Sequence, residues 1–159
     1  MSQPFMYIFA ILVIGFILVF GFFQVKKVLD FGADVEEVSF RKDLQRAVDE
    51  VYTLAPGSKK VIDNLIVPSS VEGVCFVDAT RPVRLSDIPF PLIREDLELL
   101  GSTRKNVFFV SRRGEDRLEA FIVTHLRPQG VVCFNLSLDR LNFVLENEGN
   151  VVGLRAYES

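Results

Sequence analysis

The chain has 159 residues, which is room for one ordinary domain or for a domain with an accessory segment. Its formal net charge of −3 argues against nucleic acid as a partner, because neutralising phosphates needs a basic surface. Two cysteines and one histidine are too few to form a zinc finger or an iron–sulfur cluster from one chain. No Asp, Glu, Lys or Arg precedes Lys26, so every charge falls in the later part of the chain.

An uncharged apolar run, FMYIFAILVIGFILVFGFF, covers Phe5–Phe23. As a helix rising ~1.5 Å per residue it would span roughly 28 Å, close to the thickness of the hydrocarbon core of a bilayer. A cleaved signal peptide is the main alternative, but it favours a basic start and a shorter apolar core, and Met1 to Pro4 carries no Lys or Arg. We therefore predict a retained transmembrane anchor over residues 1–27, with the lipid bilayer as its partner.

Five phenylalanines of this run fall within a narrow arc of the helical projection. They are Phe5, Phe9, Phe16, Phe20 and Phe23. Such a ridge is interpreted either as a surface that packs against other helices, in a filament or a membrane complex, or as a surface that faces lipid. The run has no GxxxG motif, so a tight helix dimer has no support.

The sequence pattern predicts an amphipathic helix followed by a turn over residues 28–58. The clearest part is SFRKDLQRAVDEVY, residues 39–52, where apolar residues recur at helical spacing and charged residues occupy the other side. Ser39 is a candidate N-cap, and Ala55-Pro56-Gly57-Ser58 ends the helix. The helix either runs unbroken from the anchor or bends near Gly32. We expect it to cover one face of a sheet.

Residues 59–159 predict a mostly antiparallel β-domain with a short helix at residues 92–100. The segments RRGED, RPQG and NEGN have the composition of turns that join neighbouring antiparallel strands. The predicted strands cover residues 61–67, 71–78, 106–112, 117–126, 130–137, 140–146 and 150–157. The fold class is therefore α+β, in which an N-terminal transmembrane helix continues into an amphipathic helix that packs on a mostly antiparallel β-sheet or small sandwich.

Cys75 and Cys133 lie in similar contexts, GVCFVD and GVVCFNLS, both in the middle of a predicted strand. They are either bonded as a disulfide or two buried small hydrophobic residues. A disulfide indicates a domain outside the cytoplasm, whereas Lys26 and Lys27 after the apolar run favour a cytoplasmic one. We predict the disulfide and an extracytoplasmic β-domain.

His125 is the single histidine of the chain and lies near the end of a predicted strand. Catalysis would require a nucleophile such as Ser111 or Ser137 and an orienting acid, and no motif links these residues. The sequence holds no nucleophile elbow, phosphate-binding loop or dinucleotide fingerprint. We expect a surface histidine, no cofactor or metal site, and a protein that is not an enzyme.

The order of a hydrophobic N-terminal helix, an amphipathic helix and a β-domain resembles the type IV pilins. The opening QPFMYIFAILVIGFILVFGFF, the segment VPSSVEGVCFVD and the terminal VLENEGNVVGLRA are similar to single-pass surface proteins of archaea. This resemblance implies a membrane-anchored structural or surface protein, whose helix packs in a membrane or filament and whose β-domain faces outward. The alternative is an accessory or partner-binding subunit of a membrane complex, bound to other protein subunits through its N-terminal helix.

Overall fold

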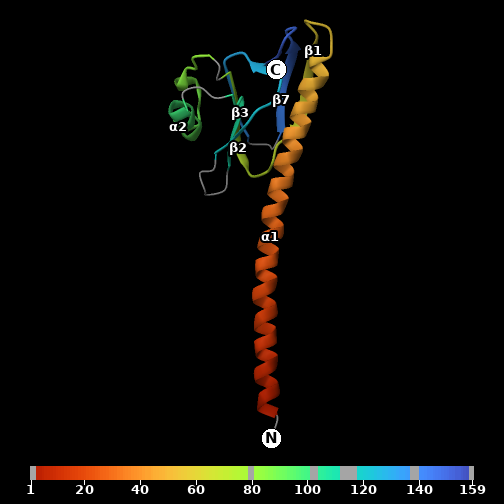
Figure 1. Cartoon of the computed structure of the whole chain (residues 1–159), viewed down its shortest axis with the longest axis vertical. Coiled ribbons are helices and arrows are strands. Elements are labelled where there is room, and N and C mark those ends of the chain that lie inside the picture. The colour runs from red at the N-terminus through yellow and green to blue at the C-terminus, as the bar shows by residue number, and fades with distance from the viewer. Residues whose placement is uncertain (1–2, 79–80, 101–103, 112–117, 137–139, 158–159) are drawn as a thin grey trace. The chain divides into compact units, whose positions relative to one another are not determined.

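The computed structural model describes residues 3–78, 81–100, 104–111, 118–136 and 140–157, without the side chains of residues 3–5, 26–34 and 100. The chain divides into two compact units, Met1–Val35 and Glu36–Ser159. The described residues form three helices and eight strands, and the strands pair into two four-stranded sheets (Figure 1). The predicted α+β class and the mostly antiparallel pairing are confirmed.

The longest element is the helix α1, Gln3–Tyr52. It includes Gly32, so the bend that the sequence left open does not interrupt the helix. Ser39 lies inside α1, and the prediction that it caps a new helix is wrong. The physical reason is that a helix already under way supplies carbonyl acceptors to the N–H groups that follow Ser39, which leaves no orphan donors to cap.

Sheet A has the strand order β1-β7-β8-β5. Neighbouring strands are antiparallel except β5 and β8, which are parallel. In β7 the side chains of Leu141, Phe143 and Leu145 are buried while their neighbours are more exposed, as the alternation of residues 140–146 predicts. The strands are β1 Lys59–Ile66, β5 Leu126–Pro128, β7 Arg140–Asn147 and β8 Val152–Ala156.

Sheet B has the strand order β4-β3-β2-β6 and is antiparallel throughout. The helix α2, Pro91–Leu100, lies beside the β2–β3 pair (Figure 1) and begins at a proline, whose fixed φ suits a first helical position. A short 3-10 helix, η1 Leu85–Asp87, precedes it. The strands are β2 Val71–Val77, β3 Val107–Ser111, β4 Leu118–Phe121 and β6 Val131–Asn135.

Two clusters of buried side chains form the core of the second unit, one on each face of sheet B. The main cluster contains apolar residues from α1 and from both sheets; Phe40, Leu44, Val48, Val51, Phe76, Phe109 and Phe143 are among them. The smaller cluster joins Cys75 and Phe108 of sheet B to Ile93 of α2. Sheet B is therefore buried on both faces, which explains the nearly continuous apolar run of β2.

The C-terminal end of α1 is held by a side chain from β7. Asn147 is 2% exposed, and its Nδ2 group donates to the carbonyls of Val51, Tyr52 and Leu54 at 3.1, 3.0 and 2.7 Å. Its Oδ1 atom accepts the N–H of Gly149 at 2.7 Å. The last carbonyls of a helix have no partner within the helix, so Asn147 satisfies groups that would otherwise be buried and unpaired.

One predicted strand, residues 117–126, is wrong as a single element. β4 ends at Phe121 in sheet B, and β5 begins at Leu126 in sheet A. Asn106 holds the segment between them: its Oδ1 atom accepts the N–H of Val123 and its Nδ2 group donates to the carbonyl of the same residue, both at 2.8 Å. His125 then adopts a positive φ of 63°, which breaks an extended run.

Candidate functional site

The first candidate site is the apolar part of α1. Met6–Val25 is long and apolar enough to cross a membrane, with a mean hydropathy of 2.8 and none of its residues buried. A signal sequence near the N-terminus meets the same criterion of length and composition. A core helix of a soluble domain would instead bury an apolar stripe. Met6–Val25 buries none of its residues, so it differs from such a core helix.

The predicted phenylalanine ridge lies on this segment. Phe9, Phe16, Phe20 and Phe23 are exposed, and the rings of Phe16 and Phe20 stack with centroids 6.2 Å apart. The side chain of Phe5 lies outside the described residues. The role of the ridge in packing against lipid or other helices stays a prediction.

The predicted disulfide between Cys75 and Cys133 is present. The two residues are direct partners in the β2–β6 ladder, with Cα atoms 4.1 Å apart, well within the ~7 Å that a disulfide needs. Both side chains lie on the face of sheet B that packs against α2. A cross-link over 58 residues of chain restricts the unfolded state, which corresponds to ~4 kcal/mol in the chain-entropy treatment.

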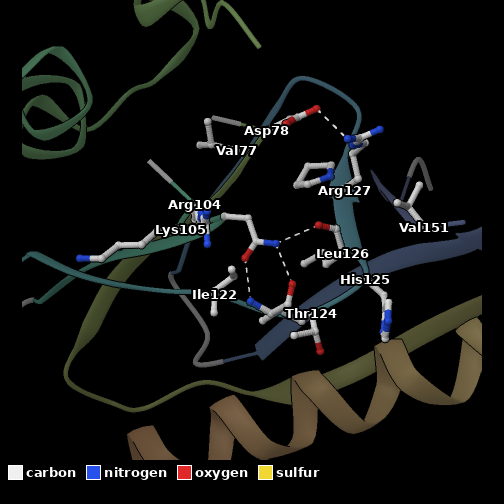
Figure 2. Close-up of a pocket in the computed structure, with 13 residues that line it drawn as sticks. Val77, Asp78, Arg104, Lys105, Ile122, Thr124, His125, Leu126, Arg127 and Val151 are labelled. Carbon is white, nitrogen blue, oxygen red and sulfur yellow. Dashed lines mark hydrogen bonds and ion pairs between the residues drawn. The ribbon is translucent and has the colours of Figure 1, made fainter. Parts of the chain in front are cut away.

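A cavity of about 430 Å³ opens beside β5 (Figure 2). Its walls come from the end of β2, the residues before β3 and the segment from Ile122 to Pro128. At the end of β2, Asp78 is only 6% exposed and forms ion pairs with Arg127 at 3.7 Å and with Arg81 at 3.5 Å. Two guanidinium groups thus compensate a carboxylate whose burial alone would be costly.

Asn106 also lines the cavity. Besides its two hydrogen bonds with Val123, the side chain of Asn106 donates from Nδ2 to the carbonyl of Leu126 at 2.8 Å. The side-chain amide has thereby used its acceptor and both donors on the backbone. Sequence reasoning missed both Asn106 and Asn147, because each residue stands beside a strand end or a turn, where asparagine is common for local reasons.

His125 lies at the edge of this cavity, and it is exposed as predicted. Its ring stacks on Tyr52 with centroids 3.9 Å apart, and its Nδ1 atom lies 3.6 Å from Oδ1 of Asp49. The hydroxyl of Ser111 donates to the carbonyl of Ser70 at 3.3 Å, and Ser137 lies outside the described residues. In the described part of the chain, His125 therefore contacts α1 through Tyr52 and Asp49.

A group of three charged side chains connects α1 to β4. Arg41 forms ion pairs with Glu37 and, at 3.2 Å, with Glu119, while its guanidinium lies 4.5 Å from the centroid of the Phe121 ring. Burial raises the pKa of Glu37 from 4.5 to about 7, and a hydrogen bond with Glu119 adds to the effect. Arg41 opposes this rise in pKa but does not cancel it.

The described residues contain no group of three or more His, Cys, Asp or Glu side chains that could hold a metal ion. Comparison with family models, curated proteins and solved structures finds no match to this chain.

Proposed function

We propose that this chain is a membrane-anchored structural or surface protein. In this proposal the N-terminal part of α1 lies in a bilayer or in the helical core of a filament, and the β-rich unit faces outward. The proposed arrangement resembles that of the type IV pilins in the order of its elements. No catalytic step is part of the proposal.

The observation that carries the proposal is that no residue of Met6–Val25 is buried. Twenty consecutive uncharged residues place apolar surface on every side of the helix, which is far more than the isolated patches that soluble proteins leave in water. Transfer of such surface to lipid or to a bundle of apolar helices is strongly favourable. A retained anchor uses this surface, whereas a cleaved signal peptide would be lost from the protein.

The disulfide supports an extracytoplasmic location for the second unit. Disulfides persist in oxidising compartments and are rare in the cytosol, where thiols are kept reduced. Cys75 is fully buried, so its bond with Cys133 is shielded on one side from reductants. The preference of Lys26 and Lys27 for the cytoplasm is a small bias by comparison, because only two residues contribute to it.

The C-terminal part of α1 acts in this proposal as a structural part of the outward unit, packed on its sheets. Phe40, Leu44 and Val48 share the main buried cluster with both sheets. The rings of Phe40 and Phe109 meet edge to face, with centroids 6.5 Å apart. A helix fixed in this way would couple the outward unit to whatever holds the N-terminal segment.

The second candidate function is that of an accessory subunit in a membrane complex. It is favoured by the cavity beside β5, whose lining includes the exposed side chains of Arg104 and Lys105. Such a concave surface would suit a segment of another protein. Purification in mild detergent separates the candidates, because a surface protein would yield copies of this chain alone and an accessory subunit would yield stoichiometric amounts of a different one.

Thiol labelling in intact cells tests the location of the second unit. We expect a membrane-impermeant maleimide to label Cys133 and Cys75 only after a cell-impermeant reductant and a denaturant have been applied to the outside. Labelling of both thiols without a reductant would contradict the disulfide. Labelling that requires lysis of the cells would place the domain in the cytoplasm and move the accessory-subunit function ahead.

A further inference from the structure

The two sheets have four edge strands, β1 and β5 in sheet A and β4 and β6 in sheet B. An edge strand presents backbone N–H and C=O groups that can pair with another chain. Natural proteins protect such edges with charges, prolines, bulges, short strands or a covering element. The four edges of this unit differ in that respect.

Three edges are protected. β1 carries Lys60, which forms an ion pair with Glu50 at 2.6 Å, and its register shifts where Asn64 adopts a positive φ of 60°. β5 has only three residues and includes Pro128, which has no N–H to donate. β4 carries Glu119, which binds Arg41 of α1.

Among the described residues, the fourth edge, β6, shows none of these features. Its sequence VVCFN contains no charged residue and no proline, and its register with β2 runs without a shift. Its side chains are only half-buried from Val131 to Phe134, while those of β2 beside it are almost all buried. β6 is therefore the unprotected edge among the four that the structure describes.

The hydrogen bonds of β6 show which backbone groups face outward. Gly130 accepts from the N–H of Asp78 at 3.2 Å and Leu136 donates to the carbonyl of Glu72 at 2.8 Å, so the even-numbered residues pair with β2. The short Cα distance of Cys75 and Cys133 agrees, because it is typical of a pair that exchanges no backbone hydrogen bonds. The backbone groups of the odd-numbered residues Val131, Cys133 and Asn135 point away from β2, and among the described residues no backbone or side-chain group bonds to them.

We propose that β6 pairs with β6 of a second copy of this chain. In an antiparallel arrangement Cys133 would lie opposite Cys133 of the second copy, and Val131 opposite Asn135. Each of these pairs consists of residues whose backbone groups face outward, so the three pairs would form about six hydrogen bonds. The two four-stranded sheets B would join into one continuous sheet.

The second copy is favoured as the occupant because the edge is complementary to itself. The outward groups lie symmetrically about Cys133, the middle residue of β6, as a twofold axis requires. No charge lies on the strand, so two copies meet without repulsion. The inference holds on either side of a membrane and does not depend on the anchor.

Hydrogen exchange by NMR on the full chain in detergent micelles tests the proposal directly. A single copy would protect the amides of Val132 and Phe134 and leave those of Val131, Cys133 and Asn135 open. We expect the latter three to exchange about tenfold or more slowly as protein concentration rises, together with a doubling of the protein mass by light scattering. Concentration-independent exchange at these three amides would overturn the proposal.

A pair of proline variants separates β6 pairing from association through α1. Asn135→Pro removes an outward N–H without breaking a bond to β2, and Val61→Pro does the same on the outer side of β1. We expect Asn135→Pro to abolish the dimer and Val61→Pro to keep it. A dimer that persists in Asn135→Pro would overturn the proposal, and the exchange measurement on the unaltered chain stands independently of how the variants fold.

Discussion

The two units of this chain use the same apolar residue types in opposite ways. In the first unit Met6–Val25 exposes every side chain, whereas in the second unit Phe76 and Phe143 are completely buried. The difference follows from patterning, because β7 and the later part of α1 are apolar on one side and can bury that side against a neighbour. A run that is apolar on all sides cannot be covered by one neighbouring element, which is why the proposed function places it in lipid or in a bundle of other helices.

Removal of residues 1–35 should have the largest effect on solubility. It removes the exposed apolar segment and leaves only the unit that buries its own apolar surface. We expect this chain to be soluble without detergent and to show a circular dichroism spectrum dominated by β-structure. Insolubility or a mainly helical spectrum would show that the second unit is not independent.

Asn147→Asp should cause a loss of stability comparable with that of a large truncation in the core. A carboxylate would face the carbonyls of Val51, Tyr52 and Leu54 and could donate to none of them, which predicts a loss of about 3 kcal/mol in the free energy of unfolding. Urea unfolding in detergent micelles measures it. The matched control is Asn150→Asp at an exposed turn residue, and an equal loss in both variants would refute the role of Asn147.

Leu44→Ala tests whether α1 is part of the core of the second unit. Leu44 is fully buried, so we expect a loss of about 2–5 kcal/mol from lost transfer energy and a cavity. The control Arg46→Ala should lower the free energy of unfolding by no more than about 0.5 kcal/mol, because the ion pair of Arg46 with Asp43 is exposed. Equal and negligible effects in urea unfolding would make this part of α1 a linker.

Glu37→Gln should give the smallest effect, visible as a change in pH dependence. The pKa of Glu37 is higher in the folded chain than its ordinary 4.5, so folding is favoured below pH 4.5 and this contribution is lost as the pH rises to about 7. Gln keeps the neutral form, so the variant should lose less stability over that window, by on the order of 1 kcal/mol once solvent screening is allowed for. Identical pH profiles for the two chains would contradict the raised pKa.

Sequence reasoning recovered the elements that follow from local pattern. The alternation of β7, the short helix after Pro91 and the apolar run of α1 are encoded within a few residues of one another. The pairing of Cys75 with Cys133 was predictable only as one of two outcomes, because the ladder that brings them together joins distant segments.

The features that escaped prediction depend on contacts between distant segments. Asn147 bonds to residues 93 to 96 positions earlier, and Arg41 meets Glu119 78 positions later. The break between β4 and β5 likewise follows from Asn106, which reaches across to a different strand. Local propensity does not depend on such distant partners, so the sequence pattern predicted a single strand over residues 117–126.

Alkaline extraction of membranes from cells that express the full chain tests the central claim most directly, because it releases peripheral proteins and retains those whose helices lie in lipid. We predict that the chain stays in the membrane pellet and that its intact mass there is the full 18.0 kDa. A chain that is released into the supernatant, or one that lacks its N-terminal segment, would contradict the membrane anchor.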